Sequence, residues 1–540
     1  MKIKVKGHSG CRIDVVPDGN DIYVYKSTSD PKYLKRLTLQ AEKQQTAASV
    51  DYQHIRVPKI LDIENTSETV IVKMQYIYSK NFIEFFEQAG FEQIDYLIVA
   101  LKSFIEYEIG QSKLQTVPSS IFHNKFTEIK GKVETNPLYK GDQVVSDIIH
   151  RSELIFSLLP STISLPVGLC HGDLTFSNIL FNGNNYFLID FLDNFIETPL
   201  QDIVKIRQDT AFHWSQLMYT KRYDAVRLRI ICEKIDREID SYFNNKYQWY
   251  RDYFQMMQLM NILRIMPYAQ EEKVVVYLKK VLTQILDTIV EPSNQQDEQL
   301  MVPLDKATLP KKHTLLVPVA ADKPEYNNGL PYVFGLDKDG IIICLKSIMG
   351  LDLGQFDDIF FTILKKHDEL FFISDLLKLQ FKRLGVKNAK VVVLEEPTVD
   401  QAETIYNTIQ KEQIEGSIFI KDADSYFKSK MKDANGIAIC PIEDLEILTP
   451  KDKSYVAIDD MYYITNIIEK AVVGHYISAG GYAFKNTASF CTYYRRLRGC
   501  GKLYLSHIIY NMLLEKKTFR PMIIEDYKDW GTAKDWSRNE

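Results

Sequence analysis

The sequence lacks a CxxC pair and long apolar runs, and it is poor in glycine and proline. Its 540 residues include 7 cysteines, 24 glycines and 19 prolines. An odd cysteine count without a close pair argues against a disulfide framework or a structural zinc site. No run approaches the roughly 18 apolar residues of a membrane helix, and the N-terminus lacks the apolar stretch of a signal peptide. We therefore expect a cytoplasmic protein with reduced thiols and no membrane span.

An excess of one charge is also lacking. The chain has 66 Lys and Arg against 71 Asp and Glu, a formal net charge of −5. Such a balance gives no bulk attraction for nucleic acid or for a membrane surface, so we expect neither as a partner. What is present is an ordinary apolar content of 45%, which excludes wholesale disorder. At roughly 100–200 residues per domain, the length predicts about two to four domains.

The pattern of expected elements changes once along the chain, near residue 300. The first part predicts strands over 1–30, a helix over 33–50, strands over 55–77 and helices over most of 82–160 and 198–290. A polar stretch with several prolines predicts a linker over 291–312. From 313 to 540 apolar strands alternate with helices, which predicts an α/β sandwich around a largely parallel sheet.

The most specific motif is the run His171-Gly172-Asp173-Leu174-Thr175-Phe176-Ser177-Asn178, followed twelve residues later by Asp190. Phosphoryl transfer needs a carboxylate near the attacking hydroxyl and oxygen ligands for the metal that holds the phosphates. A loop with Asp173 and Asn178, followed by a strand that ends at Asp190, supplies both. A polar turn before a hairpin would explain His171 and Asp173 as capping residues, but not the complete set in this order.

This arrangement resembles the aminoglycoside phosphotransferase and choline kinase group of the protein-kinase-like superfamily over residues 1–290. The resemblance implies an α+β protein-kinase-like bilobal domain, with a small lobe over about 1–77 and a helical lobe over about 78–290. It also implies ATP as phosphoryl donor and Mg²⁺ as cofactor. The implied roles are orientation or deprotonation of the substrate hydroxyl for Asp173, a bracing role for His171, and magnesium binding for Asn178 and Asp190. For the nearby acids Asp193 and Asp202 we expect structural hydrogen bonding rather than metal binding.

Residues near the start of the chain fit the nucleotide site of that family. Small residues between two strands would let backbone amides approach phosphates. The implied nucleotide-binding residues are Gly7, Ser9 and Gly10 in this loop, Lys26 on the next strand, Glu42 on the following helix as the partner of Lys26, and Gln75 and Ile77 at the inter-lobe hinge. An exposed strand edge for Lys26 and an ordinary exposed helix face for Glu42 remain as alternatives.

The acceptor region of that family follows the metal-binding acid. Here it is aromatic, with Phe212, His213, Trp214, Tyr219, Tyr223, Trp249 and Tyr250. An aromatic cage for a quaternary ammonium group and an ordinary helical core both fit this pattern. The expected partner is a small molecule with a hydroxyl group, a sugar or an amino alcohol.

Residues 313–540 resemble sugar-phosphate and alcohol-phosphate nucleotidyltransferases, which implies a Rossmann-like α/β domain of the GT-A type. The segments LEEPTVDQAETI (394–405), GSIFIKDADSYF (416–427) and EDYKDWGTAKDW (525–536) carry the resemblance. Two acids far apart in sequence can hold one magnesium ion between a triphosphate and an attacking phosphate. The implied residues are Asp424 and Asp529 as metal ligands, Asp422 beside them, Gln401 and Ala402 at the base, Glu469 and Lys470 at the sugar or phosphate, and Gly481 in the acceptor loop.

Two motifs of that second family are missing. Its triphosphate loop has paired glycines with a basic residue and is followed by Pro-Lys, whereas this chain has 321–329 without a glycine pair or an arginine, and then Pro331-Tyr332. Lys323 is the one candidate substitute in that stretch. Charge neutralisation at a transferring phosphate is worth several kcal/mol. The sequence therefore predicts a weakened or inactive transferase half, retained for binding, scaffolding or regulation.

The leading hypothesis is an ATP- and Mg²⁺-dependent small-molecule kinase fused to a nucleotidyltransferase-like domain. The fusion resembles proteins of bacterial capsule and lipopolysaccharide precursor biosynthesis. One alternative is a bifunctional enzyme that uses CTP or another nucleoside triphosphate to make a CDP- or other NDP-activated alcohol or sugar. A second alternative is a non-catalytic scaffold. The sequence leaves open whether the chain forms a homo-oligomer or a complex with other envelope-biosynthesis enzymes.

Overall fold

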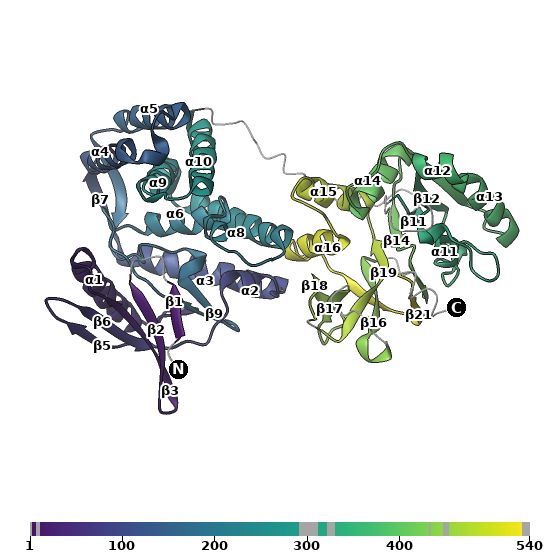
Figure 1. The fold of residues 1–540 in the computed structure, drawn as a ribbon, viewed down its shortest axis with the longest axis horizontal. Coiled ribbons are helices and arrows are strands. Elements are labelled where there is room, and N and C mark those ends of the chain that lie inside the picture. Colours follow the sequence, from purple (N-terminus) through teal and green to yellow (C-terminus); the bar gives the residue numbers. More distant parts are fainter. Residues whose placement is uncertain are drawn as a thin grey trace. The chain divides into compact units, whose positions relative to one another are not determined.

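The computed structural model describes residues 3–6, 11–290, 312–320, 330–430, 434–445, 453–472 and 474–531. The chain divides into two compact units (Figure 1). Unit 1 comprises Met1–Glu87, Gln93–Tyr223 and Ile231–Gln296, and unit 2 comprises Gln88–Glu92, Asp224–Ile230 and Asp297–Glu540. The expected linker lies outside the described residues except for Lys312, so the domain boundaries drawn from the sequence stay a prediction.

Unit 1 begins with a five-stranded antiparallel sheet on which one helix packs. The strand order is β1-β2-β3-β6-β5, and the sheet confirms the strands expected over 1–30 and 55–77. Asp30 caps the helix, because its side chain accepts a hydrogen bond from Lys32 N. Pro31 fits the first turn, because a backbone N–H at this position would have no acceptor within the helix. These elements are β1 (Ile3–Lys6), β2 (Arg12–Asp18), β3 (Asp21–Thr28), α1 (Pro31–Ala48), β5 (Ile60–Asn65) and β6 (Val70–Gln75).

The rest of unit 1 is mainly helical, and Figure 1 shows α4, α5, α9 and α10 at the opposite end of the unit from the five-stranded sheet. A short antiparallel hairpin, β9–β10, also pairs with β4. This hairpin follows the loop 171–178 and precedes Asp190, so it fixes both ends of the predicted catalytic segment. The elements are β4 (Ile55–Arg56), α2 (Phe82–Phe86), α3 (Phe91–Gln111), β7 (Lys113–Pro118), α4 (Ser120–Thr135), α5 (Gln143–Ser157), β8 (Thr162–Val167), β9 (Ile179–Asn182), β10 (Asn185–Leu188), α6 (Pro199–Thr210), α7 (Trp214–Leu217), α8 (Ala225–Lys246), α9 (Gln248–Leu263) and α10 (Glu272–Val290).

Unit 2 contains a nine-stranded mixed sheet. Its path runs β13-β12-β11-β14-β19-β16-β20, with β17 and β18 attached beside β19. The strands are β11 (His313–Pro318), β12 (Asp358–Leu364), β13 (Ala389–Leu394), β14 (Ser417–Lys421), β16 (Gly436–Pro441), β17 (Ser454–Ile458), β18 (Ile464–Glu469), β19 (Tyr476–Phe484) and β20 (Arg520–Ile523), and a separate pair is formed by β15 (Ser425–Lys428) and β21 (Glu525–Asp529). The helices are α11 (Ile343–Lys346), α12 (Lys365–Phe371), α13 (Ile373–Leu384), α14 (Gln401–Glu412), α15 (Thr487–Leu497) and α16 (Leu505–Leu514).

The expectation of a largely parallel sheet holds for only one part of unit 2. β13, β12, β11 and β14 are parallel neighbours, joined through helices as a βαβ pattern requires. β19 is antiparallel to β14, β16 and β17, and β17 is antiparallel to β18. Among the described residues between β14 and β19 no α-helix intervenes, and β16 pairs in parallel with β20, so the second part of the sheet is mixed. The α/β class itself is confirmed.

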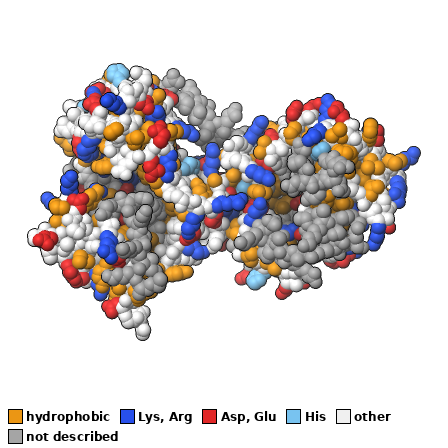
Figure 2. Space-filling model, in the orientation of Figure 1, with side chains coloured by type: hydrophobic (Ala, Val, Ile, Leu, Met, Phe, Trp, Pro, Cys, Tyr) orange, Lys and Arg blue, Asp and Glu red, His pale blue; other side chains and the backbone are white. Residues whose placement is uncertain are grey.

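Surface and helix composition agree with the charge and hydropathy of the sequence. Among the described residues, no helix has the length and apolar character needed to cross a membrane. On the face drawn in Figure 2, acidic and basic side chains are interspersed over each unit. This distribution follows from the near balance of 66 basic and 71 acidic residues.

Candidate functional site

The loop that begins at His171 is held from inside by the imidazole. His171 is fully buried; its Nε2 donates to Ile189 O at 2.9 Å, and its Nδ1 accepts from Asp173 N at 3.1 Å. These two partners fit the neutral tautomer with the proton on Nε2. Burial lowers the pKa of His171, which keeps this tautomer at neutral pH. The side chain therefore links the loop to the strand that ends before Asp190.

Two buried carboxyl groups hold the same loop from the helical side. Asp202 on α6 accepts from His171 N at 2.5 Å and from Gly172 N at 2.7 Å. Burial raises the pKa of Asp202, and burial together with the charge of Asp202 raises the pKa of Glu108 well above its usual value. Asp202 thus makes the structural hydrogen bonds expected from the sequence. Glu108 was missed, although a glutamate on the otherwise apolar buried face of α3 was visible in the sequence.

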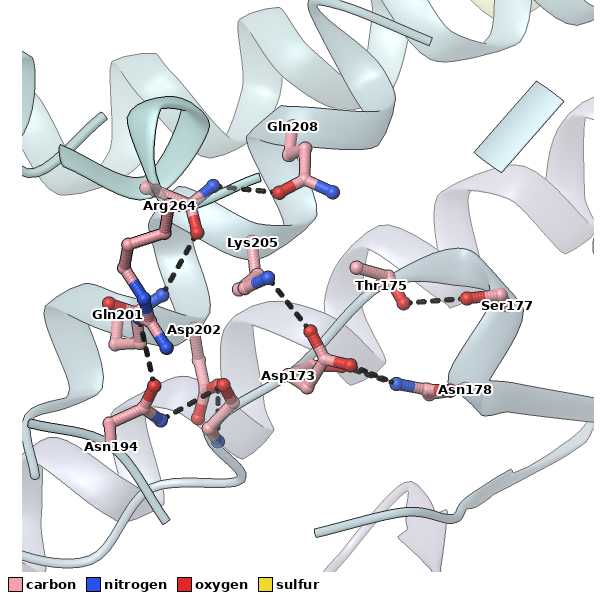
Figure 3. Close-up of polar contacts among 12 residues, drawn as sticks. Asp173, Thr175, Ser177, Asn178, Asn194, Gln201, Asp202, Lys205, Gln208 and Arg264 are labelled. Atoms are coloured by element: carbon pink, nitrogen blue, oxygen red, sulfur yellow. Dashed lines mark hydrogen bonds and ion pairs between the residues drawn. The ribbon is translucent and has the colours of Figure 1, made fainter. Parts of the chain in front are cut away.

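The carboxylate of Asp173 lies between an amide and an ammonium group (Figure 3). Its Oδ2 accepts from Asn178 Nδ2 at 2.9 Å, and its Oδ1 lies 2.9 Å from Lys205 Nζ. Burial acts to raise the pKa of Asp173, but the charge and hydrogen bond of Lys205 bring it below the usual value. Lys205 was missed by sequence reasoning. The sequence offered one signal for it: Lys205 lies three residues after Asp202, and this spacing places both side chains on one face of a helix.

Asp190 lies against the predicted nucleotide lysine. Lys26 on β3 is buried, and its Nζ lies 2.7 Å from Asp190 Oδ1 and 3.5 Å from Gln40 Oε1. Asp190 has a left-handed backbone conformation with φ of 63°. The neighbouring Ile189 N donates to Asn178 O at 3.1 Å, which keeps Asn178 and Asp190 side by side. Lys26, Asp173, Asn178 and Asp190 are therefore brought to one place from separate elements.

The predicted pairing of Glu42 with Lys26 is wrong. Glu42 is exposed, whereas Gln40 and Gln44 are buried on the face of α1 that meets the sheet. Two residues turn an α-helix by about 200°, so Glu42 faces away from Lys26. Its neighbour Lys43 instead donates to Leu192 O at 2.6 Å and to Glu197 Oε2 at 2.7 Å. The helix is thus tied to the segment after Asp190 by a lysine.

The roles of the other residues predicted to bind the nucleotide stay predictions. Gly7, Ser9 and Gly10 lie outside the described residues. Gln75 ends β6, where its N–H donates to Lys59 O at 3.0 Å, and Ile77 O accepts from Ser79 Oγ at 3.3 Å. The chain therefore leaves the sheet at the expected hinge, and the contacts of Gln75 and Ile77 with adenine stay a prediction.

The aromatic residues of the acceptor region do not gather around one point. Trp214 contacts Tyr277, Tyr219 contacts Tyr223, and Trp249 stacks on Tyr247. Tyr250 is buried and donates its hydroxyl to Asp240 Oδ1 at 2.7 Å. In the part of the chain that the structure describes, these contacts favour core packing over an aromatic cage.

The oxygen donors beside Asp173 suit magnesium in type. Mg²⁺ is usually held by one or two carboxylates together with substrate phosphates and water. The contacts with Lys26 and Asp173 use Oδ1 of Asp190 and Nδ2 of Asn178, which leaves Asp190 Oδ2 and Asn178 Oδ1 for a cation. Within the described ranges, no three His, Cys, Asp or Glu side chains form a metal-binding group of their own. The site therefore fits an ion that arrives with the nucleotide.

In unit 2 the predicted acids lie at the end of β14. Asp422 Oδ1 accepts from Gln401 Nε2 at 2.5 Å, and burial, followed by the charge of Asp424, raises the pKa of Asp422 to about 6. Trp530 N donates to Asp424 O at 2.8 Å, which brings Asp424 beside Asp529. The two predicted metal ligands are thus neighbours although about a hundred residues separate them.

Two lysines that were not predicted from the sequence lie beside these acids. Lys421 is fully buried, donates to Asp422 O at 2.8 Å and to Ser425 O at 2.7 Å, and has its pKa lowered by burial to about 8. Lys453 forms an ion pair with Asp529. Lys421 directly precedes Asp422 in the segment 416–427, so its place beside the acids was visible in the sequence, whereas Lys453 reaches Asp529 only through the fold.

The remaining residues predicted for unit 2 have different surroundings. Glu469 Oε1 accepts from Ser454 and Ser506 at 2.6 and 2.5 Å, and Lys470 Nζ lies 3.3 Å from Tyr504 Oη. The placement of Gly481 in a loop is wrong, because it pairs with Lys421 inside β19, where a Cβ would lie 2.6 Å from the Phe427 ring.

The last predictions for unit 2 concern Ala402 and the triphosphate loop. Ala402 is fully buried in the first turn of α14, so its methyl group packs inside the unit. Lys323 and the rest of 321–329 lie outside the described residues. The roles proposed for all these residues stay predictions.

Comparison with known proteins gives one family match. Residues 140–236 match the model of the phosphotransferase enzyme family. This segment contains the loop 171–178, Asp190, Asp202 and Lys205. No significant match was found among curated proteins.

Solved structures resemble each half of the chain. A thermostable mutant of aminoglycoside phosphotransferase APH(4)-Ia, a ternary complex with AMP-PNP and hygromycin B, is 11% identical; the alignment covers 54% of this chain and 95% of that one, with a TM-score of 0.38. A nucleoside-diphosphate-sugar pyrophosphorylase from Vibrio cholerae RC9 is 15% identical, with coverages of 42% and 98% and a TM-score of 0.35. An inositol-1-phosphate CTP transferase from T. maritima is 13% identical, with coverages of 42% and 91% and a TM-score of 0.34. The chain thus shows similarity to phosphotransferases, including a family match over 140–236, and similarity to nucleotidyltransferases.

Proposed function

We propose that unit 1 transfers the γ-phosphoryl group of ATP to a hydroxyl of a small molecule. The observation that carries this proposal is the ion pair between Lys26 and Asp190, whose Nζ and Oδ1 lie 2.7 Å apart across 164 positions of sequence. It places a phosphate-binding cation beside a potential metal ligand, next to Asp173 and Asn178. Such positioning is the main demand of phosphoryl transfer.

The chemistry assigned to Asp173 follows from its surroundings. The carboxylate accepts the proton of the attacking hydroxyl while the new O–P bond forms and the bond to the ADP oxygen breaks. Lys205 and Asn178 hold the carboxylate in place. Because Lys205 keeps the pKa of Asp173 below its usual value, the group is ionised at neutral pH. It therefore orients the hydroxyl and accepts the proton late in the reaction.

Magnesium would be held by Asp190 Oδ2 and Asn178 Oδ1. When bound, it neutralises charge on the β- and γ-phosphates. Lys26 contacts the same phosphates from the small lobe, and Lys43 holds the segment after Asp190 in place through Leu192 O and Glu197.

For unit 2 we propose nucleotide binding with weakened or absent transferase activity. The adjacent Asp424 and Asp529 support the binding half of this proposal. The ion pair between Lys453 and Asp529 supports the second half, because it engages one of the two acids. The bifunctional alternative would use CTP or another nucleoside triphosphate at this place.

The biological setting is part of the same proposal. A hydroxyl kinase joined to a nucleotidyltransferase-like unit fits the cytoplasmic synthesis of precursors for capsule or lipopolysaccharide. The support is the combination of the two units on one chain.

The proposal is tested with the full chain, ATP, Mg²⁺ and a panel of choline, ethanolamine, glycerol and hexoses, by measuring ADP formation. We expect turnover with at least one class of acceptor and a loss of about 10²-fold or more in Asp173→Asn, the contribution of a general base. Asp193→Asn is the matched control, because this acid is half exposed and lies 3.9 Å from its nearest cation, Lys43. Acceptor-dependent ADP formation that survives in Asp173→Asn would contradict the proposal.

A further inference from the structure

An arginine joined to the catalytic loop, Arg264, is held by a neutral side chain. Arg264 follows α9, and its guanidinium donates from Nη1 to Asn194 Oδ1 at 3.1 Å (Figure 3). The guanidinium also lies over the Phe195 ring. The side chain is partly buried, and this burial lowers the pKa of Arg264. Arg264 forms no ion pair with any residue that the structure describes. A buried cation is costly unless it is paired.

The carboxylates near Arg264 are engaged elsewhere. The charged side chains that influence its guanidinium are Asp173, Glu128 and Arg36. Asp173 is bound to Lys205, and Glu128 lies 2.7 Å from Lys125 and 2.6 Å from Lys132. The surroundings of Arg264 thus hold more positive than free negative charge.

Another arginine of unit 1 shows how a structural guanidinium is satisfied. Arg207 on α6 lies 2.9 Å from Asp236 Oδ2, forms a second ion pair with Asp240, and donates to Tyr250 Oη at 2.8 Å. Arg264 has one neutral acceptor in place of these groups. The difference indicates that the residues that the structure describes supply Arg264 with no acid of its own.

Asn194 connects Arg264 to the catalytic loop. Its Nδ2 donates to Gly172 O at 3.0 Å, and its Oδ1 accepts from Arg264. Gly172 precedes Asp173 directly, so one amide side chain spans from the arginine to the loop that carries the proposed base. A small molecule with its hydroxyl at Asp173 would therefore present its remaining part toward Arg264.

We infer that the acceptor of unit 1 carries an anionic group, a carboxylate or a phosphate, which binds Arg264 while the hydroxyl lies at Asp173. Guanidinium groups bind both anions through paired N–H donors. This inference rests on the proposed kinase function and narrows its substrate class. It excludes choline and other cationic acceptors as preferred substrates, because they would meet a cation where they need an acid.

The experiment compares matched acceptors that differ in charge, using the full chain. The two series are glycerol, D-glycerate and sn-glycerol 3-phosphate, and glucose, glucuronate and glucose 6-phosphate, with choline as the cationic member. We expect kcat/KM for at least one anionic member to exceed that of its neutral analogue by tenfold or more. The carboxylate and phosphate arms show which anion is used.

Arg264→Gln is expected to raise KM for the preferred anionic acceptor at least tenfold and to change KM for ATP by less than twofold. Arg264→Lys should recover part of the loss, because it keeps the charge. Arg251→Gln in α9 is the control, since Arg251 is exposed and its guanidinium donates to Gln248 Oε1 and Asn244 O. An equal loss with neutral and anionic acceptors would show a structural role and overturn the inference, as would a preference for glycerol, glucose or choline.

A binding measurement separates this inference from the kinase proposal. Asp173→Asn protein is titrated with the same compounds in the presence of AMP-PNP, with and without the Arg264→Gln change. If no compound gives Asp173-dependent ADP but anionic members bind through Arg264, the kinase proposal fails and the anion site stands. If ADP forms but the Arg264→Gln change alters no binding, the anion site is wrong and the kinase proposal stands.

Discussion

The ammonium group of Lys205 lies 2.9 Å from Oδ1 of Asp173, and the two residues come from a helix and a loop that are 32 positions apart. The contact opposes the effect of burial on the carboxyl group, and Asp173 keeps a pKa below its usual value. The charge state of the proposed base is therefore set by a neighbour outside the loop motif.

Removing the charge of Lys205 should move the acid limb of the pH profile. In the native protein the pKa of Asp173 lies below its usual value, so the carboxylate is ionised and kcat should be flat on its acid side between about pH 5 and 8. In Lys205→Met no ammonium group offsets the effect of burial, so the pKa of Asp173 rises. Activity should therefore fall as pH decreases within that window. Lys205→Arg keeps the charge and should leave the profile flat. An unchanged profile in Lys205→Met would contradict this role.

Lys26 and Glu42 should respond in opposite ways to neutral substitutions. Lys26→Met removes the cation that contacts Asp190 and should lower kcat/KM for ATP by about 10²-fold, the size of a lost charge contact with phosphate. Glu42→Gln should change it by less than twofold, because Glu42 is exposed on the far side of α1. Steady-state kinetics with varied ATP measures both. A large loss in Glu42→Gln would restore the pairing that the family resemblance implied.

Gly172 and Gly183 form a matched pair for stability. Both have left-handed backbones, with φ of 90° and 56°. A Cβ at Gly172 would lie 2.1 Å from Leu192 O, whereas a Cβ at Gly183 would have nothing within 4 Å. Gly172→Ala should therefore reduce the free energy of unfolding by about 2–4 kcal/mol, and Gly183→Ala by about 1 kcal/mol. Urea unfolding followed by fluorescence measures the difference, and equal losses would show that the loop relaxes around the new methyl group.

Unit 2 should bind a nucleotide without turning it over at an appreciable rate. With CTP, UTP, GTP or dTTP and a phosphorylated acceptor, pyrophosphate release should stay at background and should be the same in Asp424→Ala. Equilibrium binding in the presence of Mg²⁺ should weaken about tenfold or more in Asp424→Ala, because one of the two adjacent acids is lost. Pyrophosphate release that disappears in this variant would instead establish the bifunctional enzyme.

The local motifs of unit 1 were predictable from the sequence because their parts are close in the chain. Asp173 and Asn178 share one loop, and a short hairpin delivers Asp190, so spacing alone placed them together. Lys26 was found from its place on an early strand. The strand and helix types of both units followed from hydrophobic periodicity, which local sequence determines.

Residues that reach the sites from other elements were not predictable. Lys205, Arg264, Lys43 and Lys453 each contact a site residue through packing that no motif encodes. The error at Glu42 has the same origin, since the face of α1 that meets the sheet depends on how the helix is rotated. The mixed sheet of unit 2 was missed because hydropathy does not report strand direction.

The left-handed backbone of Asp190 has a consequence for evolution and engineering. A residue other than glycine at φ of 63° costs roughly 1 kcal/mol, although aspartate tolerates this conformation better than most residues. Asp190→Gly would relieve this strain, but it would leave the buried ammonium group of Lys26 without its carboxylate partner, which costs more. The ion pair with Lys26 therefore makes stability and turnover depend on the same acid, so a screen for thermostability alone would retain Asp190.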